Sequence, residues 1–322
     1  TGGPNLGLGA NILGNGNGAA SGAVTRTYTA ADVQKSLDYV GYTLNESRGN
    51  TANIFSGNIT GDLFEIPAGM WSFALGFENR ELDGFFSPDS LVAEGGSSTN
   101  FTLPTSGEQS IDEYYIELNM PLLKDIFLIQ SLELTYAFRQ SYYNSAGIAD
   151  TDPTDADLTT TFVKLDEIST GNSFVAAKWK PLDQLLVRYT WGESFRAPTI
   201  GDLFGGTAEG FPAATDQCNL GLVGGVPRYN TLTPAQQANC NAKTGLTTGV
   251  NQPFGQIRGL FGSSIDLQPE TGKNQTIGMV WSPSFLEGFE MSLDYWKIEL
   301  ENAISSYSVN FVIQQCNLQL DQ

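Results

Sequence analysis

The side chains with the most distinctive chemistry in this sequence are three cysteines, Cys218, Cys240 and Cys316. None of them belongs to a CxxC pair, and the first two lie in one region rich in glycine, proline and asparagine. Closely spaced cysteine pairs are typical of zinc sites, whereas two isolated cysteines in one loop favour a disulfide in an oxidising compartment. We therefore predict a Cys218–Cys240 disulfide, and we expect the partner of Cys316 to lie beyond Gln322.

The absence of histidine from the sequence narrows the chemistry that the chain can perform. It excludes Ser–His–Asp and Cys–His catalytic arrangements, and it removes the commonest zinc ligand and the imidazole ligands of haem. Neighbouring carboxylates such as Asp112–Glu113 and Glu299–Glu301 fall on predicted strands. We interpret them as lumen or rim charges rather than as an acid/base pair, and we predict that the chain is not an enzyme and has no cofactor.

An acidic cluster lies in a predicted loop and consists of Asp150, Asp152, Asp155 and Asp157. Alternating carboxylates can bind Ca²⁺, but no glycine and terminal glutamate follow at the spacing of an EF-hand. A solvated loop tip is the favoured interpretation, and a calcium site is the weaker one. The GxG patterns near the start of the chain follow no strand, so we interpret them as flexible loop rather than as a phosphate cradle.

Alternation of apolar and polar residues with a period of two recurs along the chain. From Met70, for example, Trp71 and Phe73 fall on one face of a strand, with Ser72 and Ala74 on the other. This period predicts strands rather than helices. The predicted strands are 52–63, 70–84, 111–120, 132–143, 171–180, 185–196, 273–282 and 289–302. Residues 29–41 are predicted to form a helix with Thr29 as N-cap.

The connections between these strands differ in length in a regular way. Short ones are expected at 65–69, 121–131, 181–184 and 283–288, and long ones at 85–110, 146–158 and 198–271. Short turns on one rim and long loops on the other are typical of transmembrane β-barrels. Trp71, Trp179 and Trp281 each lie beside a short turn, as an aromatic belt at a membrane interface requires. Three tryptophans capping a soluble core are the alternative.

Charge and hydropathy exclude two other classes. Acidic residues outnumber basic ones by 35 to 16, and the formal charge of -19 makes nucleic-acid binding improbable because phosphates would be repelled. The longest apolar runs, such as Ile126–Ile129, are far too short for a membrane-spanning helix.

Several segments, in their order and spacing, resemble the barrel motifs of TonB-dependent outer-membrane receptors. They are GDLFEIPAG at 61–69, GFENRE at 76–81, EYYIELNMPLL at 113–123, GESFRAPTIGDLFGG at 192–206 and the strand–turn–strand unit at 267–306. The resemblance covers the chain from about Asp38 onward. It implies an all-β fold, a transmembrane antiparallel β-barrel of about 22 strands with a plug. Residues 1–322 would supply part of that barrel domain, with the plug, the TonB box and the last strands outside the chain.

The resemblance implies active transport across the bacterial outer membrane. The partners would be TonB, reached through the plug, outer-membrane lipid, and a scarce small-molecule or oligosaccharide ligand, with no nucleic acid. An iron chelate, cobalamin, an oligosaccharide and a peptide all remain open as ligands. A passive diffusion channel is the first alternative, and a soluble or surface-attached β-sandwich binding module is the second.

The loop 199–270 is predicted to fold over the barrel mouth and to supply part of the ligand site, because loops of this length usually persist for a function. Its aromatic residues, set among Gly, Asn and Gln, are the candidate ligand contacts: Phe204, Phe211, Tyr229, Phe254 and Phe261. They would serve equally well to pack the loop against itself, and a loop that merely shields the surface is the alternative. At the loop root, we expect Arg196 to anchor the chain against Glu193 or a neighbouring carboxylate and Pro198 to end the strand.

Overall fold

The computed structural model describes residues 29–150, 160–252 and 255–318, and the chain divides into two units, Thr1–Asn45 and Glu46–Gln322. The described part of the first unit contains the helix α1, Ala30–Val40. The Thr29 side chain accepts from the backbone N–H of Asp32, and the Asp32 carboxylate accepts from the N–H of Thr29 at 3.0 Å. This reciprocal capping box confirms the helix predicted at 29–41. No helix among the described residues is both long and apolar enough to cross a membrane.

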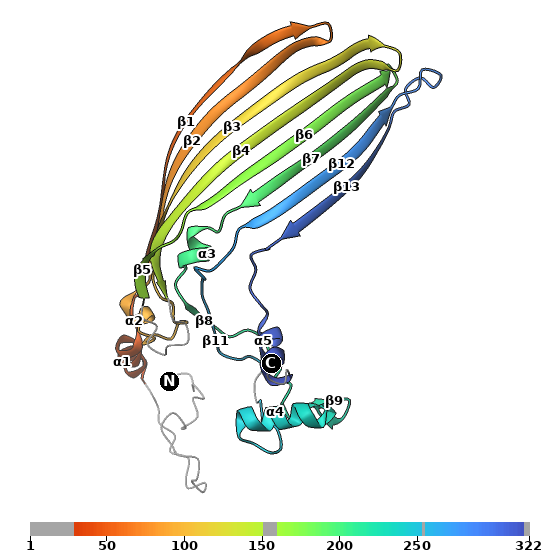
Figure 1. The fold of residues 1–322 in the computed structure, drawn as a ribbon. Coiled ribbons are helices and arrows are strands. Elements are labelled where there is room, and N and C mark those ends of the chain that lie inside the picture. The colour runs from red at the N-terminus through yellow and green to blue at the C-terminus, as the bar shows by residue number, and fades with distance from the viewer. Residues whose placement is uncertain (1–28, 151–159, 253–254, 319–322) are drawn as a thin grey trace, which may run out of the picture. The chain divides into compact units, whose positions relative to one another are not determined.

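The second unit is built on one antiparallel nine-stranded sheet in the order β1-β2-β3-β4-β6-β7-β12-β13, with β5 beside the end of β4. Figure 1 shows these strands lying side by side in one curved sheet. The strand bounds are Ser47–Ile66, Gly69–Ser87, Thr105–Ile126, Ile129–Asp150, Thr160–Lys164, Ile168–Leu182 and Leu185–Arg196 for β1 to β7, then Glu270–Trp281 for β12 and Met291–Glu301 for β13. The all-β antiparallel class predicted from the two-residue period is confirmed.

The connections have the predicted sidedness. At one end of the sheet, residues 67–68, 127–128 and 183–184 join β1 to β2, β3 to β4 and β6 to β7. At the other end, residues 88–104 and 197–269 form long loops. The short connection predicted at 121–131 is longer than the observed one at 127–128. The strand β3 continues past Pro121 through a register shift and ends only at Ile126. A bulge lets a strand carry a proline without losing its ladder.

The two faces of the sheet differ in chemistry. The register places Phe73, Leu118 and Tyr136 on one face, hereafter the apolar face, and Ala74, Glu117 and Ala137 on the other, hereafter the polar face. Along β2 the apolar positions run from Trp71 to Phe77, roughly 20 Å of strand, compared with about 9–11 residues in a tilted membrane-spanning strand. Beyond this band the apolar face turns polar, where the Asn79 amide donates to Asp112 at 2.8 Å.

All three turn-side tryptophans lie on the apolar face. The cross-strand partners of Trp179 and Trp281 are Leu132 and Leu185. The indole N–H of Trp71 donates to the Pro121 carbonyl at 3.1 Å, and that of Trp179 donates to the Leu128 carbonyl at 3.0 Å. The Trp71 and Trp179 rings therefore each have an apolar body on the sheet and a polar edge bonded to a backbone carbonyl, as an interfacial aromatic residue needs.

No second sheet covers the apolar face within the described ranges. Side chains such as Phe55, Ile59 and Leu293 are 67%, 62% and 63% exposed. Two small clusters of buried apolar residues lie instead around Phe204 and around Tyr229, while Ile111 and Met120 are buried on β3 outside both clusters. A β-sandwich would bury its apolar faces against each other, so this arrangement removes the sandwich alternative.

Candidate functional site

A charged cluster occupies the polar face where β2, β3 and β4 run side by side. The Glu113 carboxylate, whose side chain is 6% exposed, accepts from Arg80 Nη2 at 2.7 Å and from the Ser141 hydroxyl at 2.7 Å. Arg80 Nε also lies 3.1 Å from Glu78. A buried carboxylate is tolerated only when its charge and its lone pairs are met, and these contacts meet both.

A cavity of about 670 Å³ opens beside this cluster and has the size of a small-molecule site. Its lining includes Tyr115, Arg139, Tyr143, Asn172 and Phe174 from β3, β4 and β6. The cavity lies where β6 and β7 part.

The pairing between β6 and β7 ends at Phe174 and Gly192 on the loop side. Beyond this point β6 stays paired with β4, and β7 stays paired with β12. The backbone N–H of Ser173 donates across the divide to the Glu193 carboxylate at 3.3 Å.

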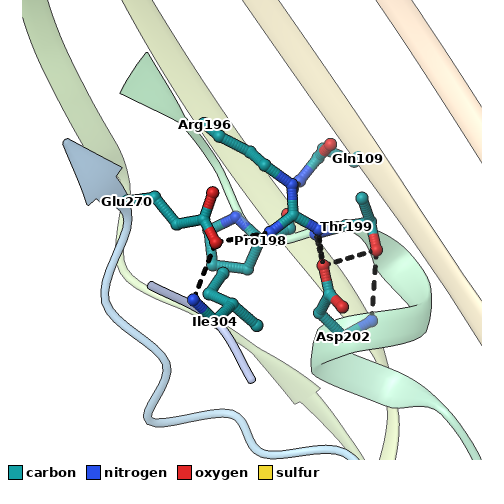
Figure 2. A network of polar contacts seen from close by, with 7 residues as sticks. All are labelled: Gln109, Arg196, Pro198, Thr199, Asp202, Glu270 and Ile304. Carbon is teal, nitrogen blue, oxygen red and sulfur yellow. Dashed lines mark hydrogen bonds and ion pairs between the residues drawn. The ribbon is translucent and has the colours of Figure 1, made fainter. Parts of the chain in front are cut away.

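A polar clasp holds the root of the longest loop, and Figure 2 shows its members. Arg196 Nη2 donates to Asp202 Oδ2 at 2.9 Å, and its Nη1 lies 3.3 Å from Glu270 Oε1. The same Glu270 oxygen accepts from the backbone N–H of Ile304 at 2.7 Å. One guanidinium thus ties the end of β7 to α3, Ile200–Phe204, and to the start of β12, while Glu270 holds the segment that follows β13.

The anchoring role expected for Arg196 is present, but Glu193 is not its partner. Residues three apart on a strand point to opposite faces, and the Glu193 carboxylate is engaged by Ser173 instead. Burial raises the pKa of Asp202, but hydrogen bonds from Thr199 and the Arg196 guanidinium more than offset this effect. The net result is a pKa below the ordinary value, so Asp202 stays charged to a lower pH than an ordinary aspartate does.

The loop then crosses onto the polar face of β3 and β4. The Phe204 ring lies so close to Gly107 and Gly147 that a Cβ on either glycine would come within 2.7 Å and 2.6 Å of it. Leu203 and Phe204 are both 1% exposed and pack with Ala149. The two glycines are therefore required for α3 to lie flat on the strands.

Backbone hydrogen bonds join this loop to the connection between β2 and β3. Leu103 N–H donates to the Thr207 carbonyl at 2.8 Å, and Glu209 N–H donates to the Phe101 carbonyl at 2.7 Å. The short strands β8, Ala208–Gly210, and β11, Gly259–Phe261, then pair with each other. The two long connections consequently form one folded structure. The paired strands β8 and β11, hereafter the neck, connect the residues between them to the rest of this structure.

Residues 212–257, hereafter the disulfide lobe, lie between these two short strands. Described parts of the lobe include β9, Leu222–Val223, β10, Val226–Pro227, the 3-10 turn Arg228–Thr231, and α4, Pro234–Thr244. The structure joins Cys218 to Cys240, with a Cα–Cα distance of 5.8 Å. The backbone N–H of Thr215 donates to the Asn310 side chain at 2.8 Å, which connects the lobe to α5, Val309–Leu318.

The five candidate aromatic residues of the loop separate into different environments. Phe204 and Tyr229 are buried, and the Tyr229 hydroxyl donates to Asn241 at 2.9 Å, so both side chains make the contacts of packing residues. Phe211 and Phe261 are 45% and 39% exposed. Phe254 lies outside the described residues, and among the other four only Phe211 and Phe261 offer exposed rings.

The remaining sequence candidates have these positions. Asp152, Asp155 and Asp157 of the acidic cluster lie outside the described residues, Asp150 is the last residue of β4, and the early GxG segment is likewise undescribed. Within the described ranges no group of three or more metal-binding side chains is placed to hold an ion. Cys316, on α5, is exposed and free.

Sequence reasoning missed the cluster around Glu113 and the cavity beside it. The alternation of residues had assigned Glu113 and Arg139 to non-apolar faces of their strands. Only the strand register shows that Glu113 pairs with Glu78 and Ser141, and that Arg139 pairs with Tyr115.

Comparison with known proteins gives one family and one solved structure. The family model described as TonB dependent receptor-like, beta-barrel matches residues 4–321. No curated protein matches the chain. Among solved structures, a double mutant of the Serratia marcescens hemophore receptor HasR, in complex with its hemophore HasA and heme, is similar at 13% identity and a TM-score of 0.49. The match covers 81% of this chain and 34% of that one, so the chain spans about a third of the receptor's length.

Proposed function

Because this chain belongs to the TonB-dependent receptor-like β-barrel family, we propose that it forms part of the barrel of a receptor that binds a scarce ligand outside the cell and imports it with energy supplied through TonB. The family consists of transport receptors of the bacterial outer membrane, and the chain resides in that membrane. The long-loop end of the sheet would face the outside, and the short turns would face the periplasm.

The observation that carries the proposal is the chemistry of the two sheet faces. The apolar face is uncovered within the described residues and is bounded by tryptophans at the turn side. The polar face bears the Glu113 cluster and the adjoining cavity. A sheet with one face for lipid and one for water suits a barrel wall around a polar interior.

The strands β1 and β13 are the edges of this sheet. In a bilayer, unpaired backbone groups are costly, so both edges would pair with further strands in a closed barrel. We propose a barrel of about 22 strands, occupied by a plug through which TonB acts. The ligand would be an iron chelate, cobalamin, an oligosaccharide or a peptide, and the exposed Phe211 and Phe261 are its proposed contacts in the loop.

A passive diffusion channel is the second candidate. The path of the long loop argues against it, because α3 packs onto the polar face and would narrow the mouth of a closed barrel. An open channel would need this space for solute flow.

Uptake experiments separate the two candidates. The full receptor is expressed in cells with and without TonB, and uptake is measured for ferric citrate, cyanocobalamin, maltoheptaose and a tripeptide. We expect saturable uptake of one probe class that disappears without TonB. Uptake that rises linearly with concentration and is equal in both strains would identify a passive channel instead.

A further inference from the structure

The guanidinium of Arg139 differs from those of Arg80 and Arg188 on the same face, because each of these donates to a carboxylate whereas Arg139, among the described residues, donates no hydrogen bond. Its shortest contact with a carboxylate is 3.7 Å, from Nη1 to Glu113 Oε2. That oxygen already accepts from Arg80, and the other Glu113 oxygen accepts from Ser141. Each oxygen of the carboxylate beside Arg139 therefore already accepts a hydrogen bond from another residue.

Arg139 nevertheless has a defined position. Its guanidinium lies over the Tyr115 ring, 5.4 Å from the ring centroid, which is within the range of a cation–π contact. The Tyr115 ring in turn lies across Gly76, where any Cβ would collide with it. Glycine, aromatic ring and guanidinium form a stack across β2, β3 and β4. The stack holds the charge while leaving its N–H groups unused.

The stack faces the cavity of about 670 Å³, and the Arg139 side chain is 54% exposed. A second aromatic ring lines the same cavity, that of Phe174, which packs on Gly192. The neighbours of Arg139 along β4 point to the apolar face of the sheet. Phe138 is the last apolar position on that face, and Gln140 is the first polar one. Arg139 is thus level with the outer edge of the apolar band, where a ligand entering from the loop side would arrive.

From these observations we propose that the cavity is a subsite for a ligand that carries a single oxyanion group, such as a carboxylate, on a planar ring. Two guanidinium N–H groups would donate to the two oxygens in the geometry that arginine favours. The ring would pack against Phe174, because the Arg139 guanidinium already lies over the Tyr115 ring. Glu117 and Glu193 also line the cavity, so a ligand with several negative charges would be repelled. The inference rests on the proposed receptor function and specifies its ligand chemistry.

The first test is chemical modification of the receptor folded in detergent micelles. Phenylglyoxal reacts with unpaired guanidinium groups, and the adducts are quantified by peptide mass spectrometry. Arg188 is the internal control, because it makes a bidentate ion pair with Asp294 at 2.8 Å on the same face. We expect Arg139 to react at least fivefold faster than Arg188. Equal rates would overturn the proposal, because Arg139 would then have no special availability.

The second test measures binding with two isosteric probes, 4-fluorobenzoate and its neutral counterpart 4-fluorobenzamide, by fluorine NMR titration. The wild type should bind the benzoate at least tenfold more tightly than the benzamide. Arg139→Gln should weaken benzoate binding at least tenfold, and Arg139→Lys should weaken it less because one charge remains. The matched control is Lys178→Gln, which removes a polar-face cation roughly 20 Å away along the strands and should change binding less than twofold.

Three results would overturn the subsite: no binding of benzoate, equal binding of both probes, or equal effects of the Arg139→Gln and Lys178→Gln variants. Correct assembly of each variant is checked by its resistance to trypsin. The measurement is made at equilibrium without TonB, so its failure would leave the uptake experiment and the proposed transport function intact. Conversely, TonB-independent uptake with intact benzoate binding would refute the transport proposal alone.

Discussion

The clasp at the root of the longest loop makes a quantitative prediction. Replacing Arg196 with alanine removes its contacts at 2.9 Å to Asp202 and 3.3 Å to Glu270. Charged hydrogen bonds contribute about 1.5–3 kcal/mol when buried, but the Arg196 side chain is 45% exposed and solvent screens the pair. We therefore expect the closed form of the loop root to lose about 1.5 kcal/mol. That corresponds to an approximately tenfold increase in local opening.

Hydrogen exchange measured by mass spectrometry reports this opening directly. The reporters are the amides of Leu203 and Gly205, which donate to the Thr199 and Gly201 carbonyls at 3.0 Å and 3.2 Å. Their exchange should accelerate about tenfold in Arg196→Ala. Exchange in β3 and β4 should stay unchanged, because the sheet ladder does not depend on the clasp. Arg188→Ala, at the short-turn end, is the matched control and should leave both amides unaffected.

The pH dependence of the clasp has a definite sign. The pKa of Asp202 is lowered in the folded chain, so its stabilising effect is present above the ordinary carboxylate pKa and is lost as pH falls through the lowered value. Exchange at Leu203, corrected for its intrinsic rate, should therefore accelerate below about pH 4 in the wild type. In Arg196→Ala the acceleration should begin at a higher pH. Unchanged exchange in the variant at neutral pH would refute the assignment of Arg196 as the clasp.

Three further predictions concern the lobe, the packing of α3 and the membrane belt. Deleting 212–257 and joining β8 to β11 with a short turn should leave the barrel assembled and trypsin-resistant, because loop residues contribute little to the strand ladder. TonB-dependent uptake should fall at least tenfold, and unchanged uptake would show that the lobe only shields the surface. Phe204→Ala should release α3 at a cost of about 3–5 kcal/mol, seen as loss of exchange protection at Leu203, whereas retained protection would contradict the packing role. The interfacial belt formed by Trp71, Trp179 and Trp281 is tested in a variant whose remaining tryptophans are replaced by phenylalanine. The tryptophan fluorescence of this variant should be quenched most by lipids brominated near the headgroup, and quenching by deeply brominated lipids alone would exclude the belt.

The sequence by itself determined the fold class and the sidedness of the connections. The alternation of Trp71, Ser72, Phe73 and Ala74 predicts a strand with one apolar and one polar face, because successive side chains of a strand point to opposite sides. The capping residues of α1 were equally local, because Thr29 and Asp32 satisfy each other within one turn. The proximity of Cys218 and Cys240 also followed from chain position, since both lie in one segment, and the structure bonds them.

Strand ends were less predictable than strand centres. The apolar alternation stops near Ile111, yet β3 begins at Thr105, because a backbone ladder continues wherever a neighbouring strand supplies its hydrogen bonds. Polar residues at these positions give no periodic signal. The bulge beyond Pro121 is similar, since its position depends on the partner strand β4.

Only the tertiary structure decided which side chains meet. Arg80, Glu113 and Ser141 belong to three strands and are brought together by register, a property of the pairing and not of any one segment. The partners of Arg196 were fixed by the turn into α3 and by the return of β12, so the sequence left Glu193 and other carboxylates open and only the fold selected Asp202 and Glu270. Phe204 and Phe211 have the same side chain in the same loop, yet one is buried on two glycines of neighbouring strands and the other is exposed. Burial depends on which surfaces the folded chain brings into contact, and residue type alone does not specify those surfaces.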